Sequence, residues 1–246
     1  MNVPVVRPWA VRGLKEQPPS GVTLHACDLD SDTDLPLAEA MARLTADEAA
    51  RAARMPLSRE RQRFQRARGF LRGVLAAELG CAPRDVPLAE GLNGKPCLAA
   101  PVAAGSPDFN LSHSGGLAVL AISRIGAVGI DVERPERPFD PMDLAASVFC
   151  PEELSTLRSL PEAERMDRFL IYWMAKEARM KLTGEGLSLE PRSIALGLSD
   201  GMPQSVSAPV WPAVDIHVLR VPGRLAICAL ATARGAADMQ EPRRWA

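Results

Sequence analysis

Four segments of the chain have apolar residues at the three- and four-residue spacing of a helix that buries one face. Glycine follows the two longest segments directly, and glycine commonly ends a helix because it adopts left-handed backbone without strain. The predicted helices cover residues 37–53, 58–79, 151–159 and 162–183, with Thr45 as a candidate N-cap inside the first segment.

Short apolar runs bounded by glycine, proline and polar residues predict strands in two blocks. The first block lies in the N-terminal half and just past the middle, and the second lies in the last quarter. The predicted strands cover residues 22–27, 109–112, 117–123, 128–132, 193–198, 214–219 and 225–231, with a turn at 91–96 and a proline-rich loop at 135–141.

The two strand blocks indicate an internal repeat with an offset of about 108 residues. Residues 117–122 align with 225–230, and the same offset places Phe64 on Tyr172 inside two predicted helices. Such strands also match by chance, because they consist mostly of alanine and leucine. Two halves, at 1–123 and 124–246, would form a ligand cleft where they meet.

Composition indicates a globular chain with no general affinity for nucleic acid or anionic membranes. Apolar residues make up 47% of the 246 residues, and 29 basic residues balance 30 acidic ones to a net charge of −1. No apolar run approaches the roughly 18 residues that span a bilayer, and the first residues lack a signal-peptide pattern. The five cysteines are scattered without a metal-type pair, which favours reduced thiols in the cytoplasm.

Two acidic residues share one face of a predicted strand in Gly129-Ile130-Asp131-Val132-Glu133. Residues i and i+2 of a strand point the same way, so Asp131 and Glu133 project together. Adjacent carboxylates repel each other unless a cation lies between them, and Mg²⁺ prefers such oxygen ligands. The alternative is an exposed strand end with two solvated acids.

A second candidate group lies on the predicted helix 162–183. Glu177 and Lys181 are one turn apart, and Trp173 lies one turn before Glu177 on the same face. They form either an ordinary surface ion pair or a working pair. In the second case Glu177 is a metal ligand or general base, and Lys181 holds a phosphate or leaving group.

Three basic or polar regions are candidate phosphate contacts. Ser112 and His113 lie beside a glycine turn, but adjacent strand residues point to opposite faces, which argues against a serine hydrolase dyad. Lys95 lies on a tight turn. The segment 51–72 holds eight arginines, which form a solvated helix face or bind a phosphate-rich ligand or an acidic protein.

The order and spacing of these motifs resemble the 4′-phosphopantetheinyl transferases of the surfactin-synthetase-activating (Sfp-like) type. The resemblance spans roughly residues 40–190. The tryptophan and the Lys-Glu-Ala sequence of the last motif are most similar to those of the branch that serves nonribosomal peptide and polyketide synthases. The motifs that carry it are Gly94-Lys95-Pro96, Phe109-Asn110-Leu111-Ser112-His113-Ser114, Gly129-Ile130-Asp131-Val132-Glu133 and Trp173-Met174-Ala175-Lys176-Glu177-Ala178 with Lys181.

The resemblance implies an α+β fold, a monomer built as a pseudo-dimer of two similar α/β halves with the active site at their interface. It also implies transfer of 4′-phosphopantetheine from coenzyme A to a serine of an apo acyl or peptidyl carrier protein, with release of 3′,5′-ADP. Glu48 stands where a relative has a lysine. By position, the resemblance implies Asp131, Glu133 and Glu177 as ligands of Mg²⁺ (or Mn²⁺), Glu177 and Lys181 as catalytic residues, and Arg51, Arg63, Lys95, Ser112, His113 and Lys181 as coenzyme A contacts.

Two other functions fit the same residues. One is a Mg²⁺-dependent phosphoesterase that cleaves a nucleotide pyrophosphate with water. The other is a non-catalytic coenzyme A-binding or protein-interaction module.

Overall fold

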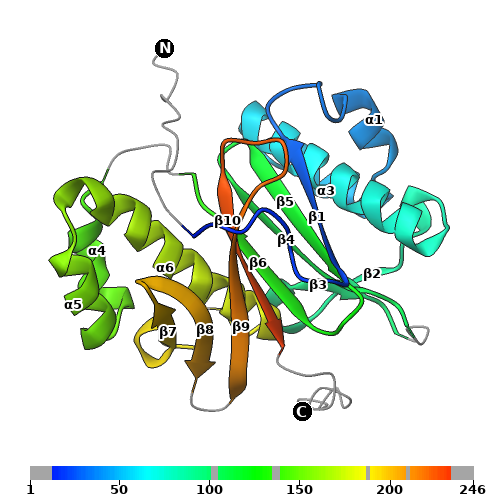
Figure 1. The fold of residues 1–246 in the computed structure, drawn as a ribbon. Helices are drawn as coiled ribbons and strands as arrows, with labels where there is room; N and C mark the ends of the chain where they lie inside the picture. Colours follow the sequence, from blue (N-terminus) through cyan, green and yellow to red (C-terminus); the bar gives the residue numbers. More distant parts are fainter. Residues whose placement is uncertain (1–12, 101–104, 135–138, 187–188, 209–210, 234–246) are drawn as a thin grey trace.

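Two antiparallel sheets pack against each other, and a group of three helices covers the outer face of each (Figure 1). The computed structural model describes residues 13–100, 105–134, 139–186, 189–208 and 211–233. The α+β prediction is confirmed. Figure 1 shows the helices of the N-terminal half on one side of the strands and those of the C-terminal half on the other.

The N-terminal half contributes a three-stranded sheet and three helices. The sheet has the order β1-β5-β4 and is formed by β1 (Val22–Asp28), β4 (Asp108–Ser114) and β5 (Leu117–Ser123). The helices are α1 (Leu37–Ala42), α2 (Ala46–Ala53) and α3 (Ser58–Leu79). Short 3₁₀ turns and a small hairpin follow, namely η1 (Pro83–Asp85), β2 (Leu88–Glu90), η2 (Leu92–Gly94) and β3 (Pro96–Leu98).

The C-terminal half contributes a five-stranded sheet with the order β6-β10-β9-β8-β7. Its strands are β6 (Val128–Val132), β7 (Ala195–Ser199), β8 (Met202–Ala208), β9 (Trp211–Arg220) and β10 (Ile227–Ala233). Its helices are α4 (Pro141–Val148), α5 (Pro151–Ser159), α6 (Glu162–Thr183) and the 3₁₀ turn η4 (Pro191–Ser193).

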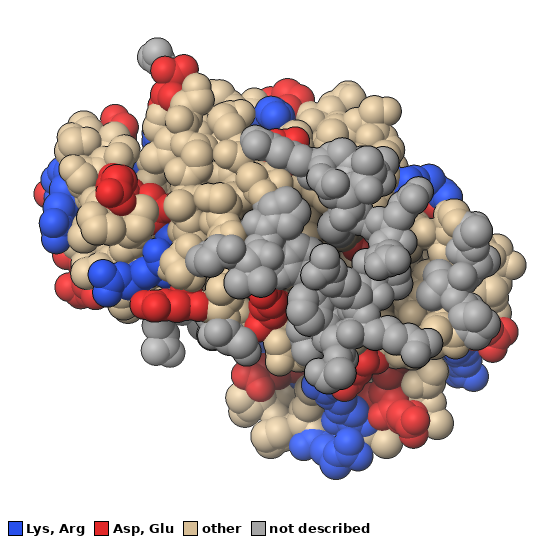
Figure 2. Space-filling model, turned by 90° about the horizontal axis from the view of Figure 1, so that it is seen from below, with Lys and Arg blue, Asp and Glu red and all other residues tan. Residues whose placement is uncertain are grey.

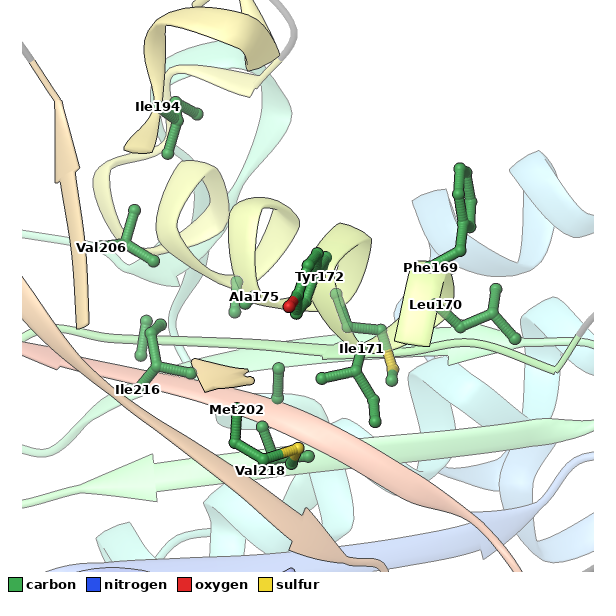
Figure 3. Packing of buried hydrophobic residues seen from close by; sticks show 14 of the residues in the cluster. Phe169, Leu170, Ile171, Tyr172, Ala175, Ile194, Met202, Val206, Ile216 and Val218 are labelled. Carbon is green, nitrogen blue, oxygen red and sulfur yellow. The ribbon is translucent and has the colours of Figure 1, made fainter. Parts of the chain in front are cut away.

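Side chains of the central strands point alternately to the two faces of each sheet, and the apolar core is therefore divided into three layers. In β10, Ile227, Ala229 and Ala231 face α6, whereas Cys228 and Leu230 face the other sheet. Figure 3 shows the first of these layers, where α6 packs apolar side chains over the second sheet. Every residue of β5 is buried, because both faces of this strand are covered.

The helical segment predicted over 37–53 forms two helices, α1 and α2, and the chain breaks between them at Thr45, the candidate N-cap. The Thr45 side chain accepts from the Glu48 N–H, and the Glu48 carboxylate accepts from the Thr45 N–H, which is a capping box that starts a new helix. The two longest helices end as predicted. Gly80 and Gly184 follow them with φ of 67° and 76°, the left-handed conformation of a helix C-cap.

Helix α4 and strand β8 are two of the elements that the sequence did not predict. Pro141, predicted as loop, is the first residue of α4, since proline suits the N1 position and Asp140 caps Met142 N–H. Pro135 and Pro138 of that predicted loop lie outside the described residues. Strand β8 was missed because its sequence, with one proline and three polar residues, lacks an apolar run.

The two halves share an order of elements, but the 108-residue register is wrong. In each half the first strand pairs with the last strand, which pairs with the strand before it. Leu117 is 1% exposed whereas its predicted counterpart Leu225 is 70% exposed, and β10 begins two residues after Leu225. The likeness in order supports a pseudo-dimer, while the boundary at residue 123 stays a prediction.

None of the helices in the described part of the chain is both long and apolar enough to cross a membrane.

Candidate functional site

The two sheets meet through an unusual ladder between β4 and β6. Four side chains at alternate positions of β4 accept hydrogen bonds from four backbone N–H groups at alternate positions of the β6 segment. The pairs are Asp108 with Val128 N (2.8 Å), Asn110 with Ile130 N (2.8 Å), Ser112 with Val132 N (3.4 Å) and Ser114 with Arg134 N (2.9 Å). This ladder satisfies the edge of β6 and places its acidic residues beside the serines of β4.

Three carboxylates gather at this junction. Asp131 is 2% exposed, Glu133 follows the end of β6, and Glu177 lies on α6. Burial raises the pKa of each of the three above its usual value. The charges of Asp131 and Glu133 add to the rise in the Glu177 pKa, and that of Asp131 adds to the rise in the Glu133 pKa, so the three groups lie within electrostatic reach of one another.

A lysine from α6 lies against the most buried of these carboxylates. Lys181 Nζ donates to Asp131 Oδ1 and, at 3.0 Å, to Ser112 Oγ. Ser112 Oγ in turn donates to Asp131 Oδ1 at 2.9 Å. The predicted pairing of Glu177 with Lys181 one turn away is present only as an electrostatic effect that opposes the rise in the Glu177 pKa.

The close approach of β6 to α6 explains how these residues meet. A Cβ added at Gly129 would lie 2.0 Å from Ala178 O and 2.4 Å from Leu182 N, so only glycine lets the strand lie against the helix backbone here. Asp131 follows Gly129 by two residues, and Lys181 precedes Leu182. The glycine of the pentapeptide therefore sets the distance between the carboxylates and the lysine.

The carboxylate group fits a hard divalent cation. Asp131 Oδ2 is buried and has no hydrogen-bond donor among the described residues, which is costly unless a cation or water satisfies it. Carboxylate oxygens are the ligands that Mg²⁺ and Mn²⁺ prefer. Within the described ranges, no three His, Cys, Asp or Glu side chains are already arranged around one point to hold an ion.

A cationic edge lies next to the carboxylates. His113 is exposed at the end of β4, on the strand face opposite Ser112 and Ser114. Desolvation lowers the His113 pKa, and the positive charges of Lys181 and Arg63 lower it further. Lys181 and Arg63 therefore lie within electrostatic reach of His113, and all three were predicted to contact phosphates.

Arg63 is held by a carboxylate of the loop after β1. Arg63 Nε and Nη2 donate to the two oxygens of Asp30, each at 2.7 Å, and Arg59 Nη2 donates to Asp30 at 2.9 Å. These bonds hold the Asp30 pKa well below its usual range, although burial acts against them.

Lys95 is placed between the halves, near the end of α6. Its Nζ donates to Leu182 O at 3.0 Å and Val128 O at 3.3 Å, and desolvation lowers its pKa. Asn93 Nδ2 donates to Gly184 O and Glu185 O. The loop around η2 thus caps the last turn of α6, and coenzyme A contact by Lys95 stays a prediction.

The arginines of 51–72 do not form one solvated patch. Arg72 is buried, with Nε on Glu48 at 2.7 Å and Nη1 on three backbone carbonyls. Arg66 is buried too and pairs with Asp32. Arg51 remains exposed on α2, 3.8 Å from Glu90 and over the Phe64 ring. Basic and acidic side chains also lie interspersed on the face drawn in Figure 2.

Sequence reasoning missed Ser114 and Asn110 as parts of this site. Both belong to the polar set at alternate positions of β4, and that period of two within Asp108–Ser114 was the available signal. Trp173 lies on the same helix as Glu177, as predicted, but its effect, which lowers the Glu133 pKa, depends on how α6 lies against β6.

Comparison with known proteins supports the resemblance in the motifs. Residues 127–224 match the family model of the 4′-phosphopantetheinyl transferase superfamily. The 4′-phosphopantetheinyl transferase HetI of Nostoc sp. is 36% identical over 198 residues, which cover 80% of this chain and 81% of that protein. A 4′-phosphopantetheinyl transferase of Bacillus subtilis is 32% identical over 142 residues, which cover 57% of this chain and 60% of that protein. The chain belongs to the 4′-phosphopantetheinyl transferase superfamily.

Proposed function

We propose that this chain transfers the 4′-phosphopantetheine group of coenzyme A to a serine of an apo acyl or peptidyl carrier protein and releases 3′,5′-ADP. The observation that carries the proposal is the junction of β4, β6 and α6, where three carboxylates adjoin Lys181 and His113. Carboxylates beside cationic groups suit a substrate whose diphosphate is bound through a metal ion.

The proposed metal ligands are Asp131, Glu133 and Glu177. Bound Mg²⁺, or Mn²⁺ in its place, would supply positive charge to the diphosphate as charge develops on the leaving group. The unpartnered Asp131 Oδ2 and the raised pKa values of all three carboxylates support this assignment.

The transfer forms a bond from the carrier serine oxygen to the β-phosphorus of coenzyme A. The bond from that phosphorus to the bridging oxygen breaks, and the electron pair leaves with 3′,5′-ADP. Glu177 accepts the serine proton, directly or through water; the raised pKa makes it a better base than a solvated glutamate. Lys181 would lie beside the diphosphate; in the structure its Nζ donates to Asp131 Oδ1.

Arg51, Arg63, Lys95, Ser112 and His113 are the proposed coenzyme A contacts. The charges of Arg63 and Lys181 both lower the His113 pKa, so these three groups lie near one another, which supports placing phosphates of coenzyme A beside them. The Ser112 hydroxyl already bonds to Asp131, Lys181 and Val132 N. Its contact with coenzyme A would therefore lie at the edge of this hydrogen-bonded cluster.

We further propose that the protein acts as a monomer in the reducing cytoplasm. One chain supplies site residues from both halves, and all five cysteines are free thiols. Nonribosomal peptide and polyketide synthases are the proposed source of the carrier proteins.

The test is incubation of an apo carrier protein with coenzyme A and Mg²⁺, followed by intact-mass measurement. The expected result is a mass gain of one phosphopantetheine on the carrier serine, with 3′,5′-ADP in the supernatant. Loss of coenzyme A with unmodified carrier would indicate a phosphoesterase, and no turnover would indicate a binding module; either result would contradict the proposal.

A further inference from the structure

Ser114, at the end of β4, contacts a proposed metal ligand from the other half of the chain. Its Oγ donates to Glu133 Oε2 at 2.9 Å and accepts from Arg134 N at 2.9 Å. The hydroxyl therefore donates its one proton to the carboxylate and accepts the backbone N–H on one of its two lone pairs, and the two bonds together fix its rotamer.

The same arrangement occurs two residues earlier on the same face of β4. Ser112 Oγ donates to Asp131 Oδ1 and accepts from Val132 N. Each serine bonds to a carboxylate 19 residues ahead and to the N–H 20 residues ahead. Two consecutive acids are thus each held by one hydroxyl of the first sheet.

Glu133 needs such support more than Asp131 does. It lies just beyond the last residue of β6, it is only half-buried, and its longer side chain has more rotamers to lose when it binds an ion. The Trp173 side chain on α6 lies close enough to lower the Glu133 pKa. Ser114 and Trp173 come from opposite halves of the chain.

We propose that Ser114 is a positioning residue that holds the Glu133 carboxylate in the orientation in which it binds the divalent cation. This rests on the metal site of the proposed function. Residues that orient metal ligands typically change metal affinity or activity by about 10- to 100-fold when they are removed. A positioned ligand also loses less conformational entropy on binding.

The test measures Mn²⁺ binding by electron paramagnetic resonance, in the presence of coenzyme A and without carrier protein, with a coenzyme A blank subtracted. Ser114→Ala is expected to raise the Mn²⁺ Kd by about 10-fold or more. Ser114→Thr keeps the hydroxyl, so its Kd is expected to stay within about threefold of the unsubstituted protein. Ser147→Ala, on the exposed side of α4, is the matched control and should leave the Kd unchanged.

A second readout separates positioning from a purely structural effect. In transfer assays, Ser114→Ala should raise the Mg²⁺ concentration for half-maximal rate by the same factor and leave the KM for carrier protein unchanged. Thermal melting without metal shows whether each variant is folded. If Ser114→Ala does not fold, Ser114→Cys, which keeps the shape but is a weak donor, takes its place with the same expected loss.

Failure of this inference differs from failure of the proposed function. If the unsubstituted protein binds no Mn²⁺, the metal site itself is wrong. If it binds Mn²⁺ and the folded Ser114→Ala or Ser114→Cys variant binds equally well, or if Ser114→Thr is as weak as the alanine variant, the role of Ser114 is wrong while the metal site stands.

Discussion

Asp131 combines deep burial with an incomplete set of partners. Lys181 and Ser112 engage Oδ1, whereas Oδ2 is buried without a donor among the described residues. A carboxylate in such a position costs stability, because desolvation disfavours its charged form and raises its pKa. Its presence is easier to explain by function than by stability.

Asp131→Asn should therefore separate activity from folding. The amide keeps the shape and the Ser112 contact but cannot supply a charged ligand, so we expect transfer to fall by more than about 100-fold. The melting temperature should stay within about 4 °C or rise, because no buried carboxylate remains to be desolvated. The measurements are kcat/KM for the carrier and a calorimetric melt. A near-normal rate in the folded variant would contradict the metal assignment.

Asp30 shows the opposite behaviour, since its partners favour the charged form. Hydrogen bonds from Arg63 and Arg59 lower its pKa in the folded protein, against an unfolded value of about 3.9. A lowered folded pKa contributes stability that is present above the unfolded value and is lost as the pH falls toward the folded one. The side chain is 36% exposed, so solvent screening reduces this contribution.

The pH dependence of Asp30→Asn checks this sign. At pH 7 we expect the variant to melt about 2 to 4 °C lower, which corresponds to roughly 1 kcal/mol for a chain of this size. Below pH 4 the difference should shrink progressively, since Asp30 loses its charge in the unfolded and then the folded protein. A difference that is constant from pH 7 to pH 2.5, or that grows as the pH falls, would show that the ion pairs with α3 are not its source.

At the scale of elements, α3 is held in place by its arginines as well as by its apolar side chains. Three of them, one turn or so apart, pair with aspartates of the loop after β1, and Arg72 reaches Glu48 of α2. Sequence reasoning found the helix and its glycine stop but not this role. A run of arginines looks the same whether its partners are solvent, a ligand or distant carboxylates of the same chain.

Arg72→Met tests the structural role. The substitution leaves Glu48 without its closest partner and removes the donor to the carbonyls of Pro83, Arg84 and Val86. Loss of one member of a buried pair costs about 3–5 kcal/mol, a large part of a typical stability. Denaturant unfolding should show that loss, whereas Arg54→Met, at an exposed position, should change stability by less than about 0.5 kcal/mol. Equal effects in the two variants would contradict the buried role.

The elements that sequence predicted best have strong local signals, and those it missed depend on distant contacts. Strand β6 was predicted from its apolar run, yet the reason for Gly129 appears only when α6 lies against it. Strand β8 is buried at Met202 and Val206 without an apolar run, because the register with β9 decides which of its residues face the core. The three carboxylates were predicted from their motifs, whereas Ser114 and Trp173 as their partners were not.

At the scale of the whole molecule, the two halves share a core and are joined through side chains. Residues of β5 from one sheet and of β6 and β10 from the other form a single apolar layer. The free edge of β6 is satisfied by the β4 side chains rather than by another strand's backbone. The repeat in the order of elements was visible in outline from the sequence. This ladder was not, because backbone donors leave no mark on residue type.

Asn110 is the ladder residue that tests this connection most directly. It is 4% exposed, and its Oδ1 accepts from Ile130 N at 2.8 Å. Asn110→Ala leaves that buried N–H without an acceptor, which costs about 1–3 kcal/mol. We expect unfolding to remain a single transition, because the shared core is intact, at a correspondingly lower denaturant concentration. Asn110 lies outside the proposed metal ligands, so Mn²⁺ should still bind.

Hydrogen exchange followed by NMR gives the residue-level readout for Asn110→Ala. The Ile130 amide should lose its protection relative to the unsubstituted protein. The Ala229 amide, in the central strand β10 between β6 and β9, should change only as much as global stability does. If Ile130 stays as protected as Ala229 in the folded variant, the side chain of Asn110 is not what secures the edge of β6, and the two halves are held together by their apolar layer alone.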